Sequence, residues 1–265
     1  MKNLKDKVIW ITGASSGIGE ALAIECAKHQ AIIILSARRE TELLRVAKQA
    51  NLNDKNSFIL PLDLSDTSKS NEYAQQIISK FGRIDILINN GGQSQRSSVI
   101  ETPAETERSL FEINYFGTVN LSKAVLPHML KKGSGKIVVI SSIAGKFGFY
   151  LRSSYSAAKH ALHGYFESLR LETEKKGISV LIVCPGKIKT NVSLNAETGA
   201  GKTHNEMDPS HEDAMSAEEC AKQIIAGIIN NKEEIFVGGK ELLVVKIKRF
   251  FPNLFGKLIR KQSPY

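Results

Sequence analysis

Short, continuously apolar segments alternate with longer segments of helical periodicity through most of the chain. Several apolar segments are unbroken aliphatic runs, among them IIIL, IVVI and VLIV. Such runs are typical of strands covered on both faces, as in a parallel sheet. The apolar segments predict strands over Lys7–Thr12, Ala31–Ser36, Phe58–Leu62, Ile84–Ile88, Gly135–Ile140 and Ser179–Val183. The periodic segments predict helices over Gly17–Lys28, Glu40–Ala50, Lys69–Phe81, Glu105–Lys131 and Tyr155–Lys175, and one that begins at Ser216.

This alternation predicts a single α/β domain. Repeated strand–helix units with right-handed crossovers build a doubly wound, Rossmann-type parallel sheet with helices on both faces. A chain of 265 residues suits one such domain and can bury a large core without disulfide or metal staples. The three cysteines, Cys26, Cys184 and Cys220, lie far apart and lack CxxC spacing. We interpret them as reduced packing residues of an intracellular protein.

The charge of the chain is concentrated near its C-terminal end. The formal net charge is +9, and Lys240 to Tyr265 contributes +6 of it through seven basic residues and one acid. These basic residues are interleaved with apolar ones and no nucleic-acid-binding motif is present, so we expect no nucleic-acid partner. Apolar runs fall far short of the roughly 20 residues that span a bilayer, and no signal-peptide pattern opens the chain. The expected location is cytoplasmic, with peripheral attachment to a membrane surface left open.

A glycine-rich turn follows the first predicted strand and precedes the first predicted helix. It reads TGASSGIG and places Gly13, Ser15, Ser16, Gly17, Ile18 and Gly19 at the helix start. Glycines let backbone N–H groups approach a pyrophosphate at the positive helix N-terminus. Glycines also mark ordinary turns, but the order of strand, turn, helix and second strand favours dinucleotide binding.

The end of the second predicted strand indicates which dinucleotide binds. An acid that would hold the adenosine ribose hydroxyls is expected there, but the chain carries Arg38 and Arg39 instead. A guanidinium attracts a 2′-phosphate, which a carboxylate would repel. We therefore predict NADP(H) as the cofactor. The alternative is that the arginines only lie on a solvated helix start.

The candidate catalytic residues lie at the carboxyl ends of the later predicted strands. Tyr155 and Lys159 are four residues apart on one helix face, where an ammonium would lower the pKa of the phenol. Ser142 ends the preceding strand, and its hydroxyl could hold a substrate oxygen beside Tyr155. Asn114 lies in the middle of the long helix predicted over Glu105–Lys131. Ligands bind at this edge of such sheets.

From Asp6 to about Val237 the chain resembles the short-chain dehydrogenase/reductase family. Four features carry the resemblance: the TGxxxGxG turn, the Asn-Asn-x-Gly strand end, the Asn-Ser-Tyr-Lys set and the Pro-Gly-x-x-x-Thr stretch. One departure is visible, because the usual Asn-Asn-Ala-Gly has Gly91 in place of alanine. That change affects packing and not chemistry.

The resemblance implies a role for each matching residue in hydride transfer between a carbonyl and an alcohol. Tyr155 would be the general acid and base, and Lys159 would lower its pKa and bind ribose. Ser142 would polarise the carbonyl, and Asn114 would help hold a water that relays protons from Lys159. Besides Tyr155, Lys159, the glycine turn and the two arginines, the implied cofactor-binding residues are Asp63, Leu64, Asn90, Gly91, Pro185, Gly186, Ile188 and Thr190.

We expect a catalytic domain over residues 1–240, in which the resemblance implies a substrate lid over 191–214, and a basic amphipathic extension over 241–265 that the family pattern does not cover. Pro252 should divide the extension into two helices. The extension lies either in a membrane interface or against the protein itself, and both remain open. The loop and tail also resemble those of membrane-associated retinoid and steroid reductases. An aromatic stretch, Phe147–Leu151, favours an apolar substrate such as a steroid, retinoid or fatty aldehyde.

Several alternatives and expectations complete the sequence-based prediction. The chain could be a catalytically idle NADP(H)-binding sensor or scaffold, although an intact Asn-Ser-Tyr-Lys set favours an enzyme. The resemblance implies a homodimer or homotetramer. The six histidines form no recognisable ligand set; His160 and His163 are three residues apart on the catalytic helix but lack a matching carboxylate. We predict no metal site.

Overall fold

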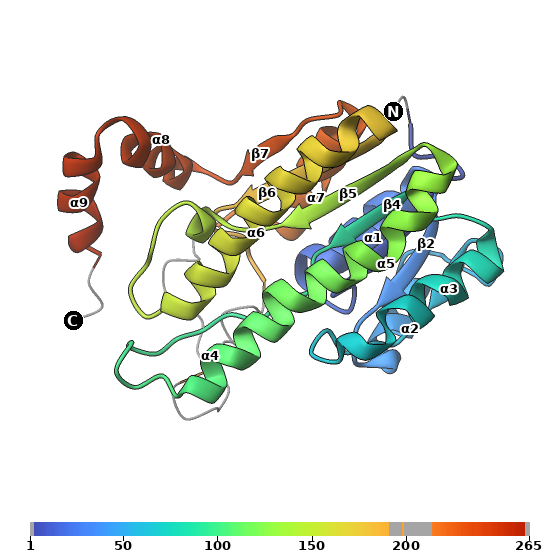
Figure 1. Cartoon of the computed structure of the whole chain (residues 1–265), viewed down its shortest axis with the longest axis horizontal. Coiled ribbons are helices and arrows are strands. Elements are labelled where there is room, and N and C mark those ends of the chain that lie inside the picture. Colours follow the sequence, from blue (N-terminus) through green and yellow to red (C-terminus); the bar gives the residue numbers. More distant parts are fainter. Residues whose placement is uncertain (1–2, 191–197, 199–213, 263–265) are drawn as a thin grey trace.

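The computed structural model, which describes residues 3–190, 198 and 214–262, contains a twisted parallel sheet covered by helices on both faces (Figure 1). In the described part of the chain this sheet has seven strands in the order β3-β2-β1-β4-β5-β6-β7, and every neighbouring pair is parallel. The strands are β1 (Val8–Thr12), β2 (Ile32–Ser36), β3 (Ser57–Ile59), β4 (Ile86–Asn89), β5 (Gly135–Ile140), β6 (Ile178–Pro185) and β7 (Glu234–Val237). The predicted doubly wound fold is therefore confirmed.

Helices form the outer layers. They are α1 (Gly17–Lys28), α2 (Glu40–Gln49), α3 (Ser70–Phe81), α4 (Ala104–Phe111), α5 (Gly117–Lys132), α6 (Ser153–Thr173), α7 (Ala217–Ile229), α8 (Leu243–Phe250) and α9 (Pro252–Arg260). One buried cluster joins the sheet to α1, α2 and α7, and a second joins its other face to α3, α5 and α6. Figure 1 shows α8 and α9 at one end of the molecule, apart from these layers.

The continuous apolar runs arise from this two-sided burial. In β1, Ile9 and Ile11 belong to the cluster with α1, whereas Val8 and Trp10 belong to the cluster on the opposite face. Successive side chains of a strand point to opposite faces, so a strand covered on both sides needs no polar alternation. The indole of Trp10 donates a hydrogen bond to Ser36 Oγ at 2.8 Å, which satisfies its polar atom inside the core.

Two elements differ from the sequence-based prediction. The long helix expected over Glu105–Lys131 is divided, because a π-helical segment over Glu112–Phe116 separates α4 from α5. The edge strand β7 was not predicted: its four residues, EIFV, carry a charge and are largely exposed, so they give a weak hydrophobic signal. Such short, partly charged strands are common at sheet edges.

Pro252 divides the C-terminal extension as predicted, since α8 ends at Phe250 and α9 begins with Pro252 at its first position. One side of the helix pair packs on the rest of the chain, where Phe255 meets Ile143 and Phe147 in a small buried cluster. The opposite face leaves Phe250 and Phe251 exposed. No helix in the described ranges is long and apolar enough to cross a bilayer.

Candidate active site

The candidate site lies where the strand order reverses between β1 and β4, at the carboxyl ends of the strands. Thr12 and Asn90 join the two strand ends. The Thr12 hydroxyl oxygen accepts hydrogen bonds from the backbone N–H groups of Asn90 and Gly91, both at 3.0 Å. The Asn90 side chain donates to the carbonyls of Thr12 and Gly13 at 3.0 and 3.3 Å. Asn90 therefore holds the glycine turn in place.

The glycine turn brings the start of α1 close to the segment after β6. Ser16, the N-cap residue of α1, makes no side-chain capping hydrogen bond. Gly17 has φ +57°, and a Cβ added there would lie 3.0 Å from Thr190 Cγ2. The open N–H groups of a helix N-terminus suit a phosphate. The turn and Thr190, predicted separately as cofactor-binding residues, thus lie against each other.

The residues predicted to bind the adenosine end lie farther along the same edge. Arg38 and Arg39 are exposed directly after β2 and before α2. Asp63 follows β3, and its Oδ1 accepts hydrogen bonds from the backbone N–H and hydroxyl of Ser65 at 2.9 and 2.8 Å. These contacts fix the Asp63 carboxylate, and Leu64 beside it is partly buried.

A glycine at position 91 is explained by its neighbour Leu64. A Cβ added at Gly91 would lie 2.5 Å from Leu64 Cδ1 and 3.3 Å from Thr12 Oγ1. An alanine would therefore require Leu64 to move. The departure from the family pattern at this position is a packing adaptation, as the sequence indicated.

Glu241, near the C-terminal end of the chain, fixes the segment after β6. Oε1 of Glu241, which precedes α8, accepts hydrogen bonds from the N–H groups of Lys187 and Gly239 at 2.9 and 3.0 Å. Ile188 is buried and forms a parallel bridge with Met215. Glu241 thus connects Pro185 and Gly186, which end β6 and begin this segment, to the C-terminal extension.

Tyr155 and Ser142 face each other across the site. Tyr155 lies in the first turn of α6, and Ser142 directly follows β5. Burial raises the pKa of the Tyr155 phenol, while the charge of Arg152 and a hydrogen bond with the Ser142 hydroxyl act in the opposite direction. Ser142 Oγ also accepts a hydrogen bond from the N–H of Ala144 at 3.1 Å, which fixes its rotamer.

Lys159 lies one helical turn after Tyr155, on the same face of α6. Its buried ammonium donates to the Ile140 carbonyl at 2.9 Å and lies 5.7 Å from the centre of the Tyr155 ring. Burial lowers the pKa of Lys159 to about 8. The lowering of the tyrosine pKa by Lys159 stays a prediction; in the structure burial raises the pKa of Tyr155, and the charge of Arg152 acts in the opposite direction.

Asn114 is completely buried in the π-helical segment. Its amide donates to the carbonyls of Gln93 and Leu110, both at 2.9 Å, and its Oδ1 accepts from the Gln93 N–H at 3.1 Å. A Cβ added at Gly92 would lie 2.6 Å from Asn114 Oδ1 and 3.5 Å from Lys159 Nζ. The side chains of Asn114 and Lys159 therefore both approach Gly92. Segments of π-helix such as the one that carries Asn114 are frequent at functional sites.

Gln95 supports the site and has no counterpart in the sequence prediction. Its buried Oε1 accepts hydrogen bonds from the N–H groups of Ser154 and Tyr155 at 2.9 and 3.2 Å. It thereby caps the helix that carries Tyr155 and Lys159. The only sequence signal is a run of polar residues, QSQ, directly after the Asn-Asn-Gly-Gly strand end.

The structure describes the aromatic stretch of the predicted substrate region but almost none of the predicted lid. The lid predicted over 191–214 lies, apart from 198 and 214, outside the described residues. The aromatic stretch is described, and Phe147 is buried between Phe149 and Phe255, with ring centres 4.7 and 5.0 Å apart. This ring therefore supports the tail and does not line an open wall.

Comparison with known proteins decides the family. A model of the short chain dehydrogenase family matches residues 7–200, which include the glycine turn, the Asn-Asn-Gly-Gly end and all four candidate catalytic residues. This chain belongs to the short-chain dehydrogenase/reductase family. Members of the family are oxidoreductases, and the predicted resemblance is confirmed.

Family members with similar sequences carry related names. Human "Dehydrogenase/reductase SDR family member 7" is 43% identical over 249 residues, covering 91% of this chain and 73% of the relative. The Drosophila melanogaster "Dehydrogenase/reductase SDR family protein 7-like" is 38% identical over 265 residues, covering 98% of this chain and 81% of the relative. These similarities support dehydrogenase/reductase activity without naming a substrate.

Solved structures of the family share the fold. A short-chain dehydrogenase from Streptomyces avermitilis superimposes with a TM-score of 0.81 at 29% identity, covering 98% of this chain and all of that one (100%). A family member from Burkholderia phymatum, determined in complex with NAD, gives a TM-score of 0.84 at 21% identity, covering 100% and 98% of the two chains.

Proposed function

We propose that this chain is an NADP(H)-dependent oxidoreductase that interconverts a carbonyl and a primary or secondary alcohol, with Tyr155 as general acid and base. The observation that carries the proposal is the burial of Lys159 beside Tyr155: the ammonium lies 5.7 Å from the centre of the Tyr155 ring and donates to the Ile140 carbonyl, in the strand that leads to Ser142. These groups lie at the strand edge that carries the glycine turn. That combination serves proton transfer to an oxygen next to a bound dinucleotide.

Tyr155 and Ser142 would share the reacting oxygen. The nicotinamide, when bound, supplies or accepts the hydride. During reduction Tyr155 gives its proton to the carbonyl oxygen, and Ser142 donates a hydrogen bond to the same atom. A pKa raised by burial keeps the phenol protonated until the oxygen gains charge. This state of Tyr155 favours its role as an acid.

Lys159 and Asn114 would supply a new proton to Tyr155 after it has protonated the carbonyl oxygen. Because burial lowers the pKa of Lys159 to about 8, its ammonium can release a proton near neutral pH. Asn114, which converges with Lys159 at Gly92, is placed to help hold a water that carries this proton. In the direction of alcohol oxidation, the Lys159 ammonium would also stabilise the Tyr155 phenolate.

The proposed preference for NADP(H) rests on Arg38 and Arg39. Both guanidiniums are exposed at the end of β2, the strand beside β1 and its glycine turn. A 2′-phosphate at this position would find a positive charge where a carboxylate would exclude it. Asp63, in the segment that follows the next strand, β3, would meet the adenine amine.

The experiment that tests the proposal measures NADPH and NADH consumption over a panel of aldehydes and ketones that includes apolar ring systems. We expect turnover with NADPH, loss of turnover in Tyr155→Phe, and nearly unchanged NADPH binding by that variant. Tyr165→Phe, on the same helix, is the matched control and should remain active. Activity of Tyr155→Phe would overturn the mechanism. NADPH binding without turnover of any carbonyl would favour an idle sensor or scaffold.

The C-terminal helices support a second element of the proposal, peripheral contact with a membrane surface. Phe250 on α8, Phe251 between the two helices and Leu254 on α9 are exposed. The neighbouring basic residues in the sequence are Lys246, Lys248, Arg249, Lys257 and Arg260. Apolar side chains beside basic ones suit an interface with anionic headgroups. Because α9 also packs on Phe147 and Ile143, directly after Ser142, the contact would bring an apolar substrate near the site. The homodimer or homotetramer stays a prediction.

A further inference from the structure

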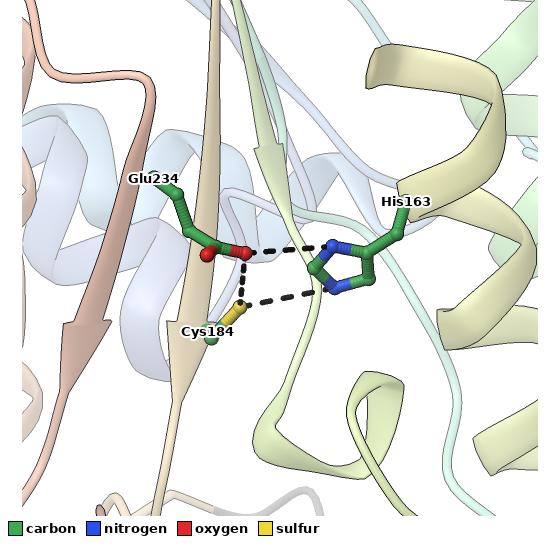
Figure 2. A group of neighbouring side chains, drawn as sticks. All are labelled: His163, Cys184 and Glu234. Atoms are coloured by element: carbon green, nitrogen blue, oxygen red, sulfur yellow. Dashed lines mark hydrogen bonds and ion pairs between the residues drawn. The ribbon is translucent and has the colours of Figure 1, made fainter. Parts of the chain in front are cut away.

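Three side chains from separate elements meet between α6 and the strands β6 and β7 (Figure 2). His163 comes from α6, Cys184 from β6 and Glu234 from β7. One ligand atom of each lies within 4.8 Å of the other two. His163 and Cys184 are buried, whereas the Glu234 side chain is 33% exposed and opens the cluster to solvent. Neither the proposed hydride transfer nor the cofactor site uses these groups.

The distances in this cluster are close to those of a zinc site. Glu234 Oε1 lies 3.8 Å from Cys184 Sγ and 3.6 Å from His163 Nδ1. Cys184 Sγ also lies 3.8 Å from Nε2, the other ring nitrogen of His163. Zinc bonds of about 2.0–2.3 Å in a tetrahedral arrangement place nitrogen, oxygen and sulfur ligands about 3.3–3.6 Å apart. The two pairs that include Glu234 need only small side-chain adjustments, and the Cys184 sulfur would have to turn from the Nε2 side of the ring toward Nδ1. A thiol, an imidazole and a carboxylate are also ligand types that zinc takes.

The ammonium group of Lys146 already lies in this cluster. Lys146 Nζ lies 2.5 Å from Glu234 Oε1 and 3.1 Å from His163 Nδ1. An ammonium only donates hydrogen bonds, so Nδ1 accepts and its lone pair points toward the shared position. The proton of the neutral ring is then on Nε2, which faces Ser141 Oγ at 3.0 Å. That second contact is the kind that orients a metal-bound histidine.

We propose that His163, Cys184 and Glu234 form a zinc site in which Zn²⁺ replaces the Lys146 ammonium. His163 would bind through Nδ1, Glu234 through Oε1 and Cys184 through its sulfur, whose proton passes to solvent when the metal binds. Water would complete the coordination, since three protein ligands leave one position open. The site lies one helical turn beyond Lys159, and Ser141 connects the two through its contacts with His163 Nε2 and the Lys159 carbonyl.

Lys146 can leave without disturbing the fold. Its side chain is 23% exposed and begins at the end of a short loop after Ser142. Phe236 offers an alternative position, because its ring centre already lies 6.0 Å from Lys146 Nζ. The expected cost of zinc binding is therefore the loss of the Lys146–Glu234 ion pair. Removing the charge of Lys146 should strengthen binding.

The test uses Co²⁺ as a spectroscopic probe on the full chain, with Zn²⁺ as competitor. We expect one equivalent of Co²⁺ to produce a thiolate-to-cobalt charge-transfer band that Zn²⁺ abolishes. Cys184→Ser should lose the band, and Cys220→Ser, at another buried cysteine, should keep it. Lys146→Met should bind about tenfold more tightly, because a like charge near the metal is removed.

Circular dichroism should show that the variants are folded. Glu234→Gln, on the exposed edge strand, changes a ligand without touching the core and should weaken binding if Cys184→Ser does not fold. Absence of the charge-transfer band in both the unmodified chain and Lys146→Met would overturn the proposal and leave a hydrogen-bonded network around Lys146. Retention of the band in folded Cys184→Ser or in Glu234→Gln with unchanged affinity would also overturn it.

Discussion

The side-chain oxygen of Gln95 accepts a hydrogen bond from the backbone N–H of Tyr155 at 3.2 Å. The same atom accepts from the N–H of Ser154, so one buried amide satisfies two donors at the start of α6. Arg152, the N-cap residue of this helix, supplies no side-chain cap. The loop after β4 therefore fixes where α6 begins, and with it the position of Tyr155.

Replacement of Gln95 by leucine should lower both stability and turnover. The change leaves two helix N–H groups without an acceptor, which costs about 1–3 kcal/mol for a buried group. Because Tyr155 moves with the start of its helix, we expect kcat to fall more than KM rises. Urea unfolding and steady-state kinetics check both effects. Gln223→Leu, on the surface of α7, is the control, and equal stability of the two variants would contradict the capping role of Gln95.

The sequence predicted the parts of the fold that local pattern encodes. The six predicted strands are present, and all but the short edge strand β3 carry an apolar run buried on both faces. The glycine turn is recognisable because its spacing is local. The role of Gln95 as a helix cap was not predicted, because its partner Tyr155 lies 60 residues farther along the chain and no motif joins the two. The π-helical segment was missed because helical periodicity continues across Asn114.

The cluster of His163, Cys184 and Glu234 shows the same limit. His163 and Cys184 are 21 residues apart and Cys184 and Glu234 are 50 apart, so no ligand spacing is visible along the chain. Parallel pairing of β6 with the unpredicted strand β7 aligns Cys184 with Phe236 and brings Glu234 nearby. Topology, not local sequence, creates this group of side chains.

Replacement of Arg38 by alanine should weaken the use of NADPH and leave that of NADH nearly unchanged. A hydrogen bond between a guanidinium and a phosphate contributes about 1.5–3 kcal/mol, so KM for NADPH should rise about 10- to 100-fold. Lys48→Ala removes the same charge from the exposed face of α2 and should change neither value. A clear preference of the unmodified chain for NADH would refute the assignment of Arg38 to a 2′-phosphate.

Replacement of Lys136 by methionine should stabilise the protein near neutral pH. Burial lowers the pKa of Lys136 from 10.5 to about 8, and its ammonium donates to Asn231 Oδ1 at 2.6 Å. Between these two pKa values the unfolded chain binds more protons than the folded chain, so stability rises as the pH increases through this window. A shift of this size corresponds to at most about 3 kcal/mol at pH 7.

The pH profile distinguishes this effect from simple repacking. Lys159 has a pKa lowered to about 8 for the same reason, so Lys136→Met should reduce the rise in stability above pH 8 without removing it. Urea unfolding at about pH 7 and about pH 10 measures the free energy of unfolding in both chains. Asn231 is exposed and can bind water after the change. A parallel pH dependence in the two chains would refute the penalty assigned to Lys136.

Replacement of Phe250 and Phe251 by serine should reduce binding to anionic vesicles. These side chains are 67% and 62% exposed, and transfer of an aromatic side chain from water contributes about 1.5–3 kcal/mol when complete. Partial insertion of both rings should therefore change the partition coefficient by about 100-fold, measured by liposome flotation.

Leu171→Ser, at an apolar residue of α6 that is 74% exposed, should float like the unmodified chain. Binding should also weaken as salt rises, because lysines and arginines surround the two rings. Equal flotation of the double variant and the unmodified chain would show that α8 and α9 do not attach the protein to a membrane surface.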